Sequence, residues 1–131
     1  MESDSEPVTL MPDPGTSVAL SRPISEIKAE LFKALGHPAR VRVLELLADG
    51  ERSVGEIQPL VGIEASHLSQ QLGVLRRAGL VTTRKAGSSV IYAIRDPQLV
   101  ELLAVSKRIL IHSLAETEDL LADLRAAVSD S

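Results

Sequence analysis

The feature that most constrains this chain is a run of 29 residues, from Pro97 to Arg125, that contains no glycine and no second proline. Apolar residues recur through the run at steps of three and four, which is the period of an α-helix. At ~1.5 Å per residue, such a helix would be roughly 43 Å long, more than a small core can cover. One face is therefore predicted to pack against another chain. The residues assigned to that dimerisation seam are Leu99, Leu103, Leu110, Leu114 and Leu121.

Four shorter helices and a β-hairpin are predicted before this run. Glycines 36, 62 and 79 end helical patterns, and Ser53 with Glu56 three residues later is typical of a capping box at a helix start. The pattern then changes to a period of two on both sides of Ala86-Gly87, which predicts a tight connection between two strands. The helices are expected over residues 24–35, 39–48, 53–61 and 64 or 65 to 78, and the strands over 80–85 and 88–95.

The order of these elements predicts the fold. Four helices, a hairpin and a long helix form a mainly α protein with a small β-hairpin, and this order is typical of a winged helix-turn-helix with a C-terminal dimerisation helix. The domain is expected to span residues 23–128. Residues 1–22 hold three prolines and four acids against one base, and they lack a periodic apolar face. They are predicted to be a disordered tail.

Composition excludes several classes of function. The chain has no cysteine, which excludes disulfides, thiolate metal sites and cysteine nucleophiles. Aromatic residues make up only 2% of the chain, which argues against modules that bind single strands by stacking bases on aromatic rings. No phosphate loop, nucleophile elbow or zinc-protease motif is present, so an enzyme is not expected. The acidic N-terminus and the lack of a long apolar stretch predict a cytoplasmic protein with no membrane partner.

The fourth helix and the hairpin carry the residue types that contact duplex DNA. Glutamine side chains can read adenine edges, serines can reach bases or phosphates, and a basic hairpin tip suits a phosphate backbone. Residues 64–95 hold five bases and one acid, a charge of +4 within a chain whose net charge is −4. The predicted DNA contacts are Ser66, His67, Ser69, Gln70, Gln71, Arg76, Arg77, Arg84, Lys85, Ser88 and Ser89.

Three stretches together resemble the ArsR/SmtB family of bacterial transcriptional regulators, and in particular its cysteine-less actinobacterial members. They are "LGHPARVRVLELL", "SHLSQQLGVLRRAGLV" and the hairpin "RKAGSSVIYAI". The resemblance implies a homodimeric repressor that binds a palindromic operator, with the fourth helix in the major groove and the wing along the backbone. His37, Pro38 and Arg40 belong to the "HPxR" signature of the family. A capping or packing role, and no chemistry, is expected for His37.

The effector is less constrained by the sequence. The family's cysteine pair is absent from "SVGEIQPLVG", and its second metal pattern is matched at only two of four positions, Asp96 and His112. His112 with Glu116, four residues later, is a candidate half-site for nickel or zinc, although an ordinary surface histidine explains the same residue. A further alternative is a helical interaction module that binds no DNA. That alternative leaves the Ser/Gln face and the basic hairpin unexplained.

Overall fold

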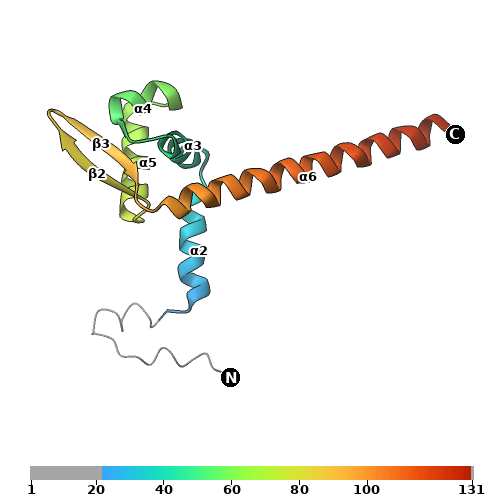
Figure 1. Ribbon diagram of the computed structural model, residues 1–131, viewed down its shortest axis with the longest axis horizontal. Helices are drawn as coiled ribbons and strands as arrows, with labels where there is room; N and C mark the ends of the chain where they lie inside the picture. The colour runs from blue at the N-terminus through green and yellow to red at the C-terminus, as the bar shows by residue number, and fades with distance from the viewer. Residues whose placement is uncertain (1–21, 131) are drawn as a thin grey trace.

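The structure is a computed structural model that describes residues 22–130 of the 131-residue chain, and the side chains of residues 22–129 (Figure 1). The predicted tail therefore lies outside the described residues except for Arg22, whose guanidinium contacts Glu30 at 2.8 Å just before the first helix. The elements are α2 (Ile24–Leu35), α3 (Pro38–Ala48), β1 (Arg52–Ser53), α4 (Val54–Val61), α5 (Ala65–Arg77), β2 (Val81–Ala86), β3 (Ser89–Ile94) and α6 (Pro97–Asp130). This order confirms the predicted fold class.

Two helix starts follow directly from local sequence. Pro38 occupies the first turn of α3, where its missing N–H costs nothing, and His37 caps the helix because its Nδ1 accepts a hydrogen bond from the Ala39 amide at 3.1 Å. At α4 the Glu56 amide donates to Ser53 Oγ, and the Ser53 amide donates to Glu56 Oε1. The capping box and the capping role of His37 are thus confirmed.

The sheet contains one strand that the sequence pattern did not predict. β1 pairs antiparallel with β3, and the strand order is β1-β3-β2. A two-residue strand has no alternation to detect, so only the tertiary structure identifies it. The predicted position of the hairpin turn was wrong by one residue: Ala86 pairs with Ser89, and the turn residues are Gly87 and Ser88. Gly87 has φ +65°, a conformation that favours glycine.

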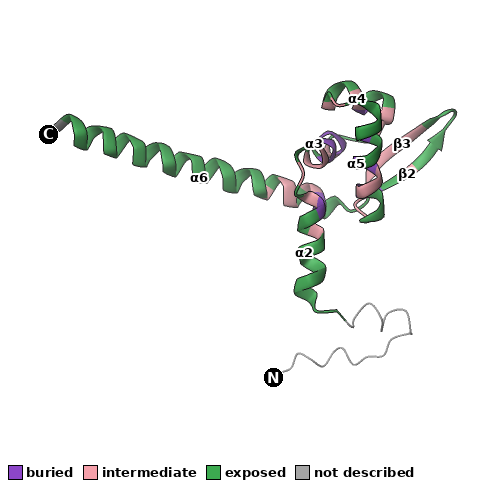
Figure 2. Ribbon diagram, turned by 180° about the vertical axis from the view of Figure 1, so that it is seen from behind, coloured by how far each residue is buried: buried purple, intermediate pink, exposed green. Residues whose placement is uncertain are grey.

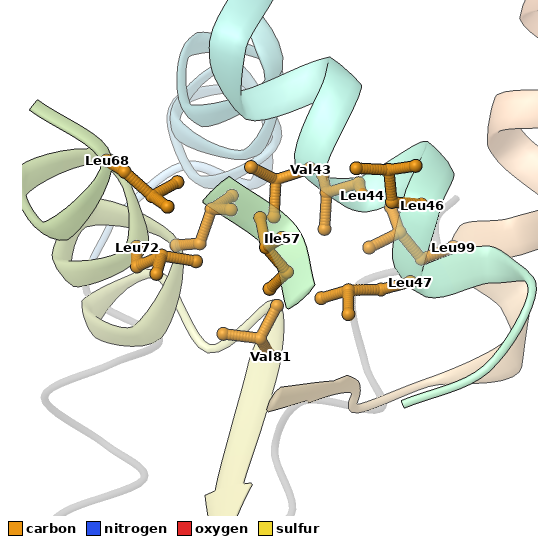
Figure 3. Close-up of a cluster of buried hydrophobic side chains, with 10 residues drawn as sticks. Val43, Leu44, Leu46, Leu47, Ile57, Leu68, Leu72, Val81 and Leu99 are labelled. Carbon is orange, nitrogen blue, oxygen red and sulfur yellow. The ribbon is translucent and has the colours of Figure 1, made fainter. Parts of the chain in front are cut away.

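The core lies where α3, α4, α5 and β2 meet (Figure 3). Leu68, Leu72 and Leu75 of α5 are buried, as are Leu44 and Leu47 of α3. Val41 of the same helix is only half-buried, whereas Val43 and Leu46 are buried. The reason is that α3 contacts α2, α4, α5, β3 and α6, so it buries a wider face than a single stripe. The buried cluster comprises Val43, Leu44, Leu46, Leu47, Ile57, Leu68, Leu72, Leu75, Val81 and Leu99.

Two helices project from this winged body, defined here as residues 38–94, and leave apolar residues uncovered. Figure 2 shows the first turns of α2 and all but the first turns of α6 as exposed. At 34 residues, α6 extends roughly 50 Å. Leu110, Leu114 and Leu121 of the predicted seam are exposed, and Leu103 is half-buried against the core. The assignment of Leu99 to that seam was wrong, because Leu99 is 7% exposed and packs in the core of its own chain.

Across residues 22–130, none of the helices combines the length and the apolar character needed to cross a membrane.

Candidate nucleic-acid interface

The outer face of α5 presents short polar side chains to solvent. α4 and α5 are joined by a short turn in which Gly62 has φ +77°, and this pair of helices has the connection of a helix-turn-helix. Leu68, Leu72 and Leu75 fix the inner face of α5 against the core. The residues left exposed on α5 include Ser66, His67, Ser69 and Gln70, as predicted.

Gln71 does not lie on that exposed face. It is 6% exposed, and its Oε1 accepts a hydrogen bond from Arg40 Nη1 at 2.7 Å. The prediction grouped Gln71 with its polar neighbours by residue type. At 100° per residue, however, position 71 follows Leu68 and precedes Leu75 on the inner face, so helical periodicity would have identified it. The side chain of Gln71 is buried against the protein and is not presented to DNA.

Arg76 and Arg77 lie in the last turn of α5 and are both exposed. Cations at this end of a helix interact favourably with the helix dipole, which stabilises the last turn independently of DNA. Arg77 also folds back along the helix: a Cβ added at Gly73 would lie 3.1 Å from Arg77 Nη1. Gly73 therefore leaves room for the Arg77 guanidinium against the helix surface.

The hairpin of β2 and β3 is the wing, and α5 contacts β2. Lys85, Ser88 and Ser89 are exposed near its tip. Arg84 is also exposed but is not free, because its Nη2 lies 2.6 Å from Glu51 Oε2 and its Nε donates to Glu51 Oε1 at 3.2 Å. Glu51 was not among the predicted site residues. It is 33 residues from Arg84 in the sequence and reaches it only because β1 joins the sheet.

The contact between Arg84 and Glu51 changes the titration of both groups. The hydrogen bond from Arg84 holds the pKa of the Glu51 carboxyl below its usual value. The same hydrogen bond, with the charge of Glu51, raises the pKa of Arg84. Both side chains therefore stay charged at neutral pH, and a DNA phosphate would meet an arginine that already has an anionic partner.

The metal candidates lie on the exposed part of α6. His112 Nε2 and Glu116 Oε2 are 3.5 Å apart on one face of the helix, and both side chains are largely exposed. Within residues 22–130, no group of three or more potential ligands converges on one point. The structure thus brings together two of the predicted ligands and adds no third from the described part of the same chain.

Comparison with known proteins assigns the family. The sequence model described as "Bacterial regulatory protein, arsR family" matches residues 37–83, from the helix-capping histidine into β2. The uncharacterised HTH-type transcriptional regulator Rv0081 of Mycobacterium tuberculosis is 53% identical over 110 residues, which cover 83% of this chain and 96% of that protein. This chain belongs to the arsR family.

The chain is also similar to a protein named as a repressor and to solved structures. The biofilm growth-associated repressor of Agrobacterium fabrum is 41% identical over 85 residues, covering 65% of this chain and 72% of the repressor. The crystal structure of Rv0081 superposes with a TM-score of 0.68 over 72% of this chain and 96% of that one. The homodimeric winged helix-turn-helix domain Mb0332 of Mycobacterium bovis, 27% identical, gives a TM-score of 0.65 over 82% of this chain and 94% of that one.

These similarities confirm the predicted family and winged helix-turn-helix fold. They also confirm that the chain is a DNA-binding transcriptional regulator and not an enzyme.

Proposed function

We propose that this arsR-family protein is a homodimeric repressor that binds a palindromic double-stranded DNA operator in the cytoplasm. The observation that carries the proposal is the exposed polar face of α5, formed by Ser66, His67, Ser69 and Gln70, next to a wing with Arg84 and Lys85. A helix of this kind fits the major groove, where its polar side chains meet base edges.

Each element has a different role in this proposal. Gln70 reads adenine, because its amide can both donate to and accept from that base, and Ser66, His67 and Ser69 contact bases or nearby phosphates. Lys85 and Arg84 bind phosphates beside the groove, together with the small residues Ser88 and Ser89, which let the backbone approach closely. Arg76 and Arg77 extend the phosphate contacts at the far end of α5.

The distribution of charge supports this orientation. Residues 64–95, which contain α5 and the wing, carry +4, while the chain as a whole carries −4. Phosphate contacts dominate the affinity of proteins for DNA, so the positive segment is the part that DNA attracts. The acids elsewhere in the chain limit binding in other orientations.

The uncovered apolar residues support a dimer. Ile24, Ile27 and Phe32 on α2 are exposed. Large exposed apolar patches on a folded protein mark interaction sites. A second copy would cover both helices, and it would set two α5 helices about 34 Å apart, one turn of the duplex. The exposed large apolar residues of α6 are Ile109, Leu110, Ile111, Leu114, Leu120, Leu121, Leu124 and Val128.

The relatives support repression and dimerisation for this chain. The Agrobacterium relative is named a repressor, and Mb0332 is described as homodimeric. Leu103, Leu110, Leu114 and Leu121 are the residues that we assign to the dimer seam on α6.

The experiment that tests this function is selection of duplexes from a random-sequence pool, followed by mobility-shift titration of the selected duplex and a random duplex of equal length. Gln70→Ala is expected to cost about 1–3 kcal/mol on the selected duplex and little on the random one. Gln98→Ala, at an exposed glutamine on α6, is the control and should change neither affinity. Equal losses on both duplexes would show that Gln70 contacts phosphate and does not read a base. If the protein selects no sequence from the pool, the proposed function is overturned.

A metal-responsive form of the same repressor is a second candidate, because His112 and Glu116 already lie together on α6. Two ligands do not fill a nickel or zinc site, so a dimer partner would have to supply the others. Titration of the dimer with nickel and with zinc should then weaken binding to the selected duplex, and His112→Ala should abolish the response. Operator affinity that is independent of both metals would return His112 to the role of an ordinary surface residue.

A further inference from the structure

The guanidinium of Arg40 joins three helices. Its Nε donates to the Ala34 carbonyl at 2.6 Å, and its Nη2 donates to the Lys33 carbonyl at 3.2 Å. These carbonyls belong to the last turn of α2, where helical carbonyls lack the usual amide partner four residues later, although the Lys33 carbonyl also accepts from the Gly36 amide. Nη1 donates to Gln71 Oε1 on α5 at 2.7 Å. Two backbone acceptors thus hold Arg40 in place while its third nitrogen reaches α5, the helix that we propose meets DNA.

The acceptor on α5 is unusual for its position. Gln71 is the one buried polar residue among the side chains that the structure describes, and it lies on the same inner face as Leu68 and Leu75. Apolar packing is not directional, so leucines alone tolerate small rotations of a helix. A hydrogen bond to a charged donor is short and directional, and a rotation of α5 about its axis would break it.

A second contact, one turn away on α5, joins that helix to the residue that caps α3. The rings of His37 and His67 meet edge-to-face, with centroids 5.9 Å apart. His67 and Gln71 are four residues apart on α5 and therefore lie on neighbouring turns. Gln70 is the neighbour of Gln71, so the rotation that Arg40 opposes is also the rotation that would displace the amide of Gln70 from a base edge.

We propose that Arg40 is a positioning residue for sequence-specific DNA recognition, which it serves by holding the rotation of α5 through Gln71. The inference rests on the proposed function, because it assigns base reading to the outer face of α5. It also gives a role to the arginine of the His37-Pro38-x-Arg40 signature. The histidine caps α3, and the arginine orients the helix that meets DNA.

The test compares four variants of the full-length protein on two probes. The probes are a duplex that the wild-type protein selects from a random-sequence pool and a random duplex of the same length. Arg40→Lys keeps the charge but loses the fork of donors, and Gln71→Met keeps the volume but removes the acceptor. Gln71→Glu keeps an acceptor for Arg40 and is the rescue variant. Arg42→Lys, at an exposed arginine on the same helix, is the matched control. Thermal unfolding is measured for each.

Arg40→Lys and Gln71→Met are expected to lower the ratio of selected to random affinity about tenfold, with random-duplex affinity unchanged within about twofold. Gln71→Glu and Arg42→Lys should keep the wild-type ratio. Variants that unfold at a lower temperature but keep the ratio would show that the contact only stabilises the fold, and would overturn the inference alone. A wild-type protein that selects no sequence would overturn the proposed function and the inference together.

Discussion

The winged body and the two projecting helices solve the problem of apolar burial in different ways. In the body, residues from α3, α4, α5 and β2 cover one another within a single chain, and side chains such as Leu44 and Leu72 are almost fully buried. Large apolar residues meet solvent at Ile24, Ile27 and Phe32 of α2 and along the outer part of α6. The body, together with Leu99 from the first turn of α6, therefore has a core of its own, whereas the projecting parts of both helices need a second surface. The difference separates the part that meets DNA from the part that joins two copies.

The largest expected effect comes from substitutions that disrupt the dimer seam on α6 and leave the core of the body intact. Leu110→Glu with Leu114→Glu places two carboxylates in the proposed seam, where burial without a partner costs several kcal/mol. We expect sedimentation to show folded monomers, with operator affinity reduced about 100-fold or more because a dimer binds two half-sites. Ala115→Glu, at an exposed residue about 100° around α6 from Leu114, is the control and should stay dimeric. An intact dimer of the double variant would contradict the seam.

The next largest effect is expected from a substitution in the core of the body, which lowers the stability of the fold. Leu72→Ala removes a buried side chain from the centre of the core, and we expect the free energy of unfolding to fall by about 2–5 kcal/mol. The same substitution at Leu60, which is 46% exposed on α4, should cost about 1 kcal/mol or less. Urea denaturation of both variants measures the difference. Equal losses would mean that the core of the body is not the source of its stability.

A third prediction concerns the DNA surface of the body. Arg84→Ala with Lys85→Ala should weaken binding to every duplex, because phosphate contacts carry no sequence information. The slope of log affinity against log salt should become shallower by about 0.9 for each phosphate that the variant no longer binds. Titrations at several salt concentrations measure both effects, with Lys28→Ala on α2 as control. An unchanged slope would remove the wing from the interface.

The smallest expected effect comes from removing the charge of Glu51, the carboxylate that contacts Arg84. Glu51→Gln removes a charged competitor of DNA phosphate, so affinity for random duplex should rise about threefold at low salt. Glu45→Gln, on α3, is the control, and combining Glu51→Gln with Arg84→Ala should abolish the gain. Unchanged or weaker binding would mean that Glu51 holds Arg84 in the pose that DNA requires.

The contact between Glu51 and Arg84 should also make the stability of the protein depend on pH in the acidic range. The pKa of Glu51 is lowered in the folded protein, so its contribution to stability is present above the unfolded pKa and is lost as pH falls through the lowered value. Protein with Glu51→Gln should lack this part of the pH dependence. Thermal unfolding from neutral to acidic pH measures it.

Much of the fold follows from local pattern. Periodicity, glycines and capping residues such as Ser53 act within a few residues, so helix order, helix ends and the hairpin are predictable from the sequence. Two predictions failed because they depended on distant neighbours: Leu99 was assigned to the dimer seam, and Gln71 to the DNA face. Both residues are buried, Leu99 against the chain's own core and Gln71 by the packing of α5 with its arginine partner on α3.

The sequence by itself determined the succession of helices and the hairpin, the polar face of the fourth helix in the described chain and the long apolar helix after the hairpin, because each depends on spacing along the chain. Only the tertiary structure decided which polar residues are free to meet DNA. Arg84 faces Glu51 across the sheet, and Arg40 reaches Gln71 across 31 residues. Contacts of this kind depend on how the elements pack in three dimensions, and residue spacing along one element carries no information about them.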